Sequence, residues 1–122
     1  MLSVVDKIIN MKNTYLRFLS LVHALDSAPV SALDETAKHL LQLIVLRHAQ
    51  DNTLTVTEAM ALSTVASPAT IHRKLDALRE AGLVAQTFEG GNRRTKYLIP
   101  TQTTDAYFDK LGLVMSEAAS HG

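Results

Sequence analysis

The sequence predicts a mainly helical α+β fold in which a short β-hairpin follows a series of helices. Apolar residues recur at helical spacing over most of the chain. Two helix starts, Thr55 to Glu58 and Ser67-Pro68, stand close together, and Gly90-Gly91-Asn92 separates two strand-like segments soon after them. Helix, turn, helix and hairpin in this order is the winged helix-turn-helix arrangement, here with a two-stranded β wing and additional helices at both ends.

Length and composition are typical of a single globular domain, 1–122. The apolar fraction of 47% is ample for a core, and the lack of cysteine excludes disulfides, thiolate metal sites, a cysteine nucleophile and thiol-based oxidant sensing. Asp6 and Lys7 interrupt the first apolar stretch, so we expect no signal peptide, and the apolar runs are too short to span a membrane. We therefore expect a cytoplasmic protein without membrane contact.

Formal net charge is zero, but the charges are unevenly distributed. Residues 67–97 hold six basic and three acidic side chains, whereas the rest of the chain holds six basic and nine acidic ones. The segment therefore carries +3 and the remainder −3. A basic segment on an acidic body is a candidate electrostatic footprint for nucleic acid.

The first helix is expected from about Ser3 to Ala24, and 1–25 is interpreted as a dimerisation or core helix. Its apolar residues cover roughly half of the helical circumference, which is wide for one small domain. A central core helix and a helix also buried by a partner subunit explain this equally well. The predicted dimer interface comprises Val4, Ile8, Met11, Tyr15, Phe18, Leu111 and Met115.

The winged helix-turn-helix is expected over residues 33–101, beginning with a helix from Leu33 to Ala49. Thr55 and Glu58 form a capping-box pattern that starts a short helix over 56–64. Ser67 is a favoured N-cap and Pro68 a favoured first residue for a helix over 68–81, which Gly82 ends.

Strands are expected over 83–88 and 95–99, with positive φ angles at the glycine-rich turn between them. Pro100 cannot extend the ladder and ends the second strand. The C-terminal helix is expected over about 105–118, within a segment 103–119, with Phe108, Leu111 and Met115 on one side.

The exposed side of the helix over 68–81 would be small, hydroxylated and basic, which suits entry into a major groove. The wing, about 89–96, carries two adjacent arginines on a glycine turn, which suits a narrow minor groove. Taken alone, the side of this helix has the simpler interpretation of a solvated basic face, and the wing that of a solvated turn. The predicted DNA-binding residues are Ser67, Pro68, Ala69, Thr70, His72, Arg73, Lys74, Arg93, Arg94 and Lys96.

Several segments resemble the multiple-antibiotic-resistance regulator (MarR) family of bacterial winged-helix repressors. They are Leu54-Thr55-Val56-Thr57-Glu58, the run from Ser67 to Leu78, Glu80-Ala81-Gly82-Leu83-Val84, and Asn92-Arg93-Arg94-Thr95-Lys96 before Pro100-Thr101. The resemblance implies a homodimer on a pseudo-palindromic operator in double-stranded DNA, without a cofactor and with a small-molecule effector that the sequence does not identify. Asn92 stands where the family has an aspartate, which predicts loss or weakening of the salt bridge that orients a wing arginine.

Other functions remain open from the sequence. A winged-helix module that binds protein instead of DNA would tolerate neutralisation of Arg73, Arg93 and Arg94. A winged-helix protein of another family would contact DNA through the same residues without half-site symmetry. No catalytic or metal site is expected, because His39 and His48 fall on opposite sides of one helix and no nucleophile or phosphate-loop motif occurs.

Overall fold

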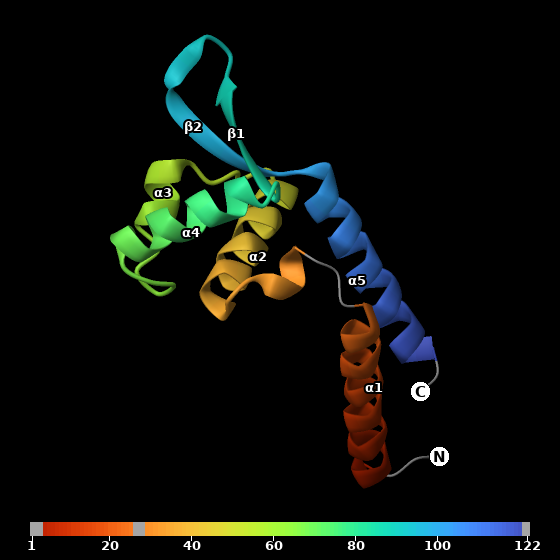
Figure 1. Ribbon diagram of the computed structural model, residues 1–122. Coiled ribbons are helices and arrows are strands. Elements are labelled where there is room, and N and C mark those ends of the chain that lie inside the picture. The colour runs from red at the N-terminus through yellow and green to blue at the C-terminus, as the bar shows by residue number, and fades with distance from the viewer. Residues whose placement is uncertain (1–3, 26–28, 121–122) are drawn as a thin grey trace. The chain divides into compact units, whose positions relative to one another are not determined.

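The computed structural model describes residues 4–25 and 29–120, and the side chains of the first helix from Met11 onward. The described elements are α1 (Val4–Leu25), the 3₁₀ helix η1 (Val30–Ala32), α2 (Glu35–Ala49), α3 (Val56–Met60), α4 (Pro68–Glu80), β1 (Val84–Glu89), β2 (Asn92–Pro100) and α5 (Gln102–Ser120) (Figure 1). The predicted mainly helical fold with a two-stranded wing is confirmed. The chain divides into two compact units, one of residues 29–105 and one that combines α1 with α5 from residue 106 onward.

The core of the unit 29–105 lies between α2, α4 and the hairpin. Leu40, Leu41 and Ile44 of α2 are buried. In the same unit, α4 buries Ile71, Leu75 and Leu78, which lie on the face that helical spacing predicts to be buried. Leu83, Val84 and Leu98 bring the base of the hairpin into the same core. Burial of a side chain of this size stabilises the fold by about 1.5–3 kcal/mol.

Local hydrogen bonds fix the starts of α3 and α4 as predicted. The Glu58 N–H donates to Thr55 Oγ1 at 3.0 Å, and the Thr55 N–H donates to Glu58 Oε1 at 2.9 Å, which completes the capping box. Ser67 caps α4 by accepting from the Thr70 N–H at 3.3 Å, and Pro68 is the first helical residue. After α4, Gly82 has a positive φ of 72°, a conformation typical of a glycine that ends a helix.

The hairpin is irregular near its tip. β1 and β2 are antiparallel, with Val84 opposite Pro100 and Thr87 opposite Tyr97, but Glu89 then lies opposite Asn92. Between these two pairs, β1 has one residue, Phe88, whereas β2 has four, 93–96. β2 begins at Asn92 instead of Thr95 and includes both arginines, while Gly90 alone of the three predicted turn residues has a positive φ, 57°.

Side-chain caps shift the helix boundaries from those expected. α2 begins at Glu35 because Asp34 accepts from the Ala37 N–H at 2.8 Å. α5 begins at Gln102, about three residues early, where Thr101 Oγ1 accepts from the Thr104 N–H. Thr104 is fully buried, and its hydroxyl donates to the Leu83 carbonyl at 2.6 Å. α3 ends at Met60, four residues before the expected boundary.

In the other unit, α1 and α5 are joined by Arg17. Its guanidinium donates from Nε and Nη2 to the Ala118 carbonyl near the C-terminal end of α5, at 3.3 and 3.1 Å. A cation at a helix C-terminus satisfies a free carbonyl and opposes the helix dipole. Ala118 is buried, whereas several large apolar side chains of this unit remain exposed: Met11, Tyr15, Leu16, Leu113 and Met115.

None of the described helices is long and apolar enough to cross a membrane.

Candidate nucleic-acid interface

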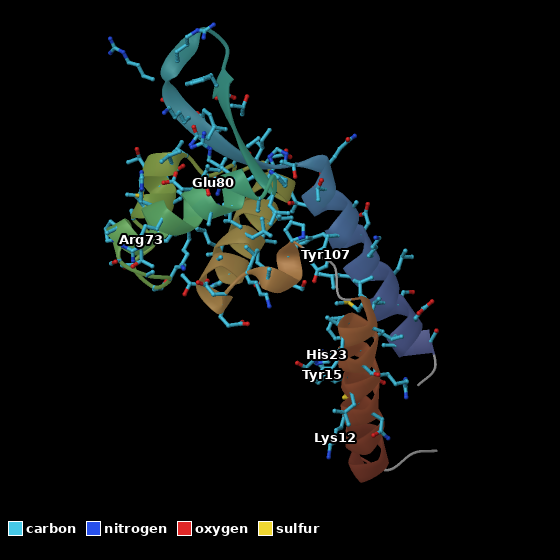
Figure 2. All side chains as sticks on the ribbon, viewed as in Figure 1. Lys12, Tyr15, His23, Arg73, Glu80 and Tyr107 are labelled. Carbon is cyan, nitrogen blue, oxygen red and sulfur yellow. The ribbon has the colours of Figure 1, made fainter. Side chains whose placement is uncertain are left out.

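A row of hydrogen-bonded polar side chains lies along the first turns of α4. Ser67 Oγ donates to Thr70 Oγ1 at 3.0 Å, and Arg73 Nη2 donates to the same oxygen at 3.1 Å. Thr70 Oγ1 thus accepts hydrogen bonds from two neighbouring side chains. Arg73 is exposed on the outer side of α4 (Figure 2). The Thr70 hydroxyl restricts the position of the guanidinium, whose remaining N–H groups can bind an acceptor.

The exposed side chains at the start of this row are small. Pro68 and Ala69 are exposed and offer no bulk. His72 is exposed too, and its Nδ1 lies 3.5 Å from a carboxylate oxygen of Asp76. Four of the predicted residues, Ser67, Pro68, Ala69 and His72, thus lie beside Thr70 and Arg73 on the outer side of one helix.

Lys74 differs from the other predicted DNA-binding residues. Its ammonium forms an ion pair with Asp34, the N-cap of α2. The hydrogen bond from Lys74 is the main reason why the pKa of the Asp34 carboxyl is lowered. This ion pair connects the middle of α4 to the start of α2, so the Lys74 charge is already neutralised within the protein.

The cations of the unit 29–105 differ in their partners. Lys38, Lys74 and Arg79 lie within ion-pair distance of carboxylates, and Arg47 donates to the Asn52 carbonyl at 3.1 Å. Apart from Arg47, the cations without a carboxylate partner in the described part of the chain are Arg73, Arg93, Arg94 and Lys96. All four were predicted as DNA-binding residues, and all four are exposed.

Asn92 organises the tip of the wing. Its Oδ1 accepts from the Arg94 N–H at 2.9 Å, and its Nδ2 donates to Thr95 Oγ1 at 3.3 Å. Asn commonly bonds to a backbone group two residues further on in this way. The side chain therefore shapes the backbone that carries the arginines, while no ion pair within residues 4–25 and 29–120 orients the arginines themselves.

The residues predicted for a dimer interface have different exposures. Met11, Tyr15 and Met115 are 72%, 59% and 60% exposed, and Tyr15 projects outward from α1 (Figure 2). Phe18 and Leu111 are half-buried. The side chains of Val4 and Ile8 lie outside the described residues. Tyr15 and Phe18 stack with ring centroids 6.2 Å apart, which joins an exposed ring to a half-buried one.

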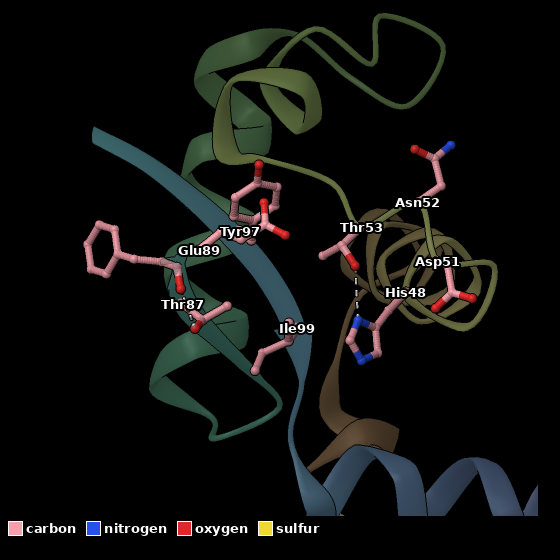
Figure 3. Close-up of a pocket in the computed structure, with 9 residues that line it drawn as sticks. His48, Asp51, Asn52, Thr53, Thr87, Glu89, Tyr97 and Ile99 are labelled. Carbon is pink, nitrogen blue, oxygen red and sulfur yellow. Dashed lines mark hydrogen bonds between the residues drawn. The ribbon is translucent and has the colours of Figure 1, made fainter. Parts of the chain in front are cut away.

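A pocket of about 400 Å³ lies between the end of α2 and the hairpin (Figure 3). Within the pocket, His48 Nδ1 is 3.1 Å from Thr53 Oγ1. The nearby Glu89 carboxylate raises the pKa of Tyr97 by hydrogen bonding and by its charge. Asp51, Asn52 and Thr87 also line the pocket. Among the described residues, no group of three His, Asp or Glu side chains could hold a metal ion.

The roles of two residues were not predicted from the sequence. Asn92 was expected only to weaken the wing, although an Asn just before two arginines in a turn is a local signal for its backbone hydrogen bond. The sequence does signal that Asp34 is an N-cap, because a helical apolar pattern follows it. It gives no signal that Asp34 pairs with Lys74, because 40 residues separate the two.

No known protein-family model matches the chain, and no curated protein matches it significantly by sequence. Solved structures do match. A MarR-like transcriptional regulator from Thermotoga maritima aligns over 99% of this chain and 81% of its own, with 14% identity and a TM-score of 0.63.

Two further structures align with similar scores. MepR, a transcription regulator of the Staphylococcus aureus multidrug efflux pump MepA, aligns over 99% of this chain and 81% of its own, with 17% identity and a TM-score of 0.54. The YusO protein from Bacillus subtilis aligns over 96% of this chain and 75% of its own, with 15% identity and a TM-score of 0.56. At such identities the likeness concerns the fold, and the chain has the winged helix-turn-helix fold found in MarR-like transcriptional regulators.

Proposed function

We propose that this chain is a sequence-selective transcription regulator that binds double-stranded DNA as a homodimer. The observation that carries the proposal is the separation of the cations in the unit 29–105. Arg73, Arg93, Arg94 and Lys96 have no carboxylate partner in the described part of the chain, whereas the other lysines and Arg79 do. Exposed arginines on the wing and on α4, which takes the place of the recognition helix in this fold, are suited to binding DNA.

In this proposal α4 enters the major groove with its N-terminal half first. The Thr70 hydroxyl would donate to a base or phosphate acceptor, and Arg73 would bind guanine with two parallel hydrogen bonds. Pro68 and Ala69 allow close approach because they add little bulk. The wing would follow the sugar–phosphate chain and place an arginine in the minor groove.

The homodimer is proposed from the unit that combines α1 with α5. Large apolar side chains exposed together on these helices mark a surface suited to burial by another molecule. A second copy of the chain would bury Met11, Tyr15 and Met115 and place two α4 helices on one operator. The solved structures with this fold include transcriptional regulators, which supports the assignment as well.

The test is a titration of the protein with duplex DNA from the region upstream of its own gene and with a scrambled duplex, each at two salt concentrations. Tighter, salt-sensitive binding to the native duplex supports the proposal, because phosphate contacts release counterions. A variant with Arg93→Ala and Arg94→Ala should bind all duplexes more weakly, whereas Lys110→Ala on α5 is the control for lost charge. Absence of binding to any duplex at low salt would instead favour a protein-binding module.

A further inference from the structure

Lys74 and Asp34 form the one ion pair, within the described part of the chain, that joins two separate elements. Lys74 lies in the middle of α4, and Asp34 is the N-cap of α2. The other three pairs among the described residues each lie within one helix, with nitrogen–oxygen distances of 3.7, 3.5 and 3.9 Å. Because α2 and α4 pack against each other in the unit 29–105, the pair holds the Lys74 ammonium against the start of α2.

The two carboxylate oxygens of Asp34 have separate partners. Oδ1 accepts from the Ala37 N–H at 2.8 Å and so caps α2. Oδ2 accepts from the Lys74 ammonium. The cap therefore orients the carboxylate through a hydrogen bond that does not involve α4, and leaves its second oxygen for Lys74.

Stability is a minor reason for such a pair. The side chains of Lys74 and Asp34 are 27% and 53% exposed, and ion pairs that water reaches contribute little to folding because water screens them. The position of Lys74 is more informative. It directly follows Arg73, so its side chain leaves α4 about 100° further around the helix. An unpaired ammonium on a flexible stem at this position would be able to reach backbone phosphates beside the major groove.

We propose that Asp34 limits sequence-independent DNA binding by keeping Lys74 away from the phosphate backbone. This inference rests on the proposed function and gives a role to a residue that would itself touch no DNA. Each cation that binds a phosphate releases counterions and so strengthens binding to any sequence. On an operator, base contacts fix the register of α4, whereas on other sequences the helix can shift until an unpaired ammonium meets a phosphate. Because selectivity is a difference between two affinities, pairing Lys74 within the protein increases selectivity without adding a contact.

Asp34→Asn separates the two functions of the carboxylate. Asparagine caps a helix as well as aspartate does, but its amide nitrogen is a donor and cannot accept from Lys74. We expect the slope of log K against log salt on a scrambled duplex to become steeper by about 0.9, and the affinity for that duplex to rise by about five- to tenfold at about 0.1 M salt. Binding to the operator should gain less, so the ratio of the two affinities should fall.

Lys74→Gln identifies the cation that is responsible. Because Lys74 is already paired, this variant alone should keep the wild-type slope. Combined with Asp34→Asn, it should return the steeper slope to the wild-type value. Asp34→Glu retains the charge and should also keep the wild-type slope. Glu35→Gln is the matched control, since Glu35 is the next carboxylate in the chain and its side chain is 94% exposed.

Three results would overturn the inference. The first is an unchanged slope for Asp34→Asn. The second is a steeper slope that persists in the double variant, because the lost negative charge and not Lys74 would then be its cause. The third is a shallower slope for Lys74→Gln alone, because Lys74 would then already bind a phosphate. Urea unfolding of Asp34→Asn at a midpoint close to that of wild type would show that the change in slope does not come from altered folding.

A measurement without DNA distinguishes failure of this inference from failure of the proposed function. Lys74 lowers the pKa of the Asp34 carboxyl, so an NMR titration of that carboxyl should show its pKa rise in Lys74→Gln. An unchanged pKa would overturn the ion pair and the inference with it. If the pKa rises but the wild-type protein binds no duplex at low salt, the proposed function is wrong and the inference falls with it. Wild-type binding of duplex without a response to Asp34→Asn overturns the inference alone.

Discussion

At the scale of the residue, the partners of the cations distinguish the proposed DNA-binding residues from those that pair within the protein. Arg73 and Lys74 are neighbours on α4, yet Arg73 bonds only to the Thr70 hydroxyl while Lys74 pairs with Asp34 across to α2. A charge with a carboxylate partner must give up that interaction before it can bind a phosphate. Lys74 is therefore a weaker candidate for DNA binding than the sequence suggested, although that prediction stays untested.

Arg73→Ala should weaken specific binding more than non-specific binding. A bidentate contact to guanine contributes about 1–3 kcal/mol of discrimination against other bases, so we expect a loss of about 5- to 150-fold on the operator. Binding to a scrambled duplex should change much less. The measurement is a pair of titrations at fixed salt, with Arg79→Ala as the matched control on the same helix. Equal losses on both duplexes would assign Arg73 to phosphate instead.

At the scale of the element, local chemistry explains why parts of the fold were predictable. The capping box at Thr55, the Ser67-Pro68 start and the positive φ at Gly82 each depend on residues within one turn, and all three are confirmed. α5 begins early at a local cap, in which Thr101 Oγ1 accepts from the Thr104 N–H, a signal that the sequence analysis did not use. The bond from the Thr104 hydroxyl to the Leu83 carbonyl joins residues far apart in the sequence and has no local signal. The β-bridge between Thr55 and Tyr97, which holds the chain before α3 against β2, has no local signal in the sequence either.

The capping box of α3 should make stability depend on pH. The Thr55 N–H and hydroxyl lower the pKa of Glu58 from its usual 4.5. Such a carboxylate stabilises the folded state above pH 4.5, and the contribution disappears as pH falls through the lowered pKa. Urea unfolding of wild type and Glu58→Gln between pH 2 and 7 should therefore give a stability difference that is greatest near neutrality and shrinks in acid. A difference independent of pH would contradict the perturbed carboxylate.

Thr55→Ala provides the complementary change at α3. Removing an N-cap hydroxyl costs about 0.5–2 kcal/mol, and the share that comes from capping the Glu58 N–H should persist in acid. The share that depends on the Glu58 charge should disappear as Glu58 is protonated, because the Thr55 hydroxyl helps to lower that pKa. Unfolding of the double variant with Glu58→Gln measures the coupling between the two side chains.

At the scale of the whole molecule, the zero net charge is the sum of a basic segment and an acidic remainder. The excess of cations is confined to α4 and the hairpin, where four of them have no acidic partner in the described chain. Residues outside 67–97 carry the compensating acidic charge. Repulsion from this acidic remainder would disfavour random contact with nucleic acid and favour approach through the basic segment. The same argument explains why composition alone would give no sign of the proposed DNA binding.

Dimerisation is the property of the whole molecule on which operator binding should depend. Tyr15→Glu places a charge within the exposed apolar side chains of α1, and burying an unpaired charge in an interface is costly. We expect sedimentation equilibrium to show a rise of about 30-fold or more in the dimer dissociation constant, and binding to a two-site operator to lose its steepness.

Asn13→Glu adds the same charge two residues away, about 200° around the helix, and should leave the dimer intact. Because α4 and the wing are untouched, Tyr15→Glu should still bind a single half-site with wild-type salt sensitivity. Loss of half-site binding would mean that the substitution disturbs folding, and an unchanged dimer would place the interface elsewhere.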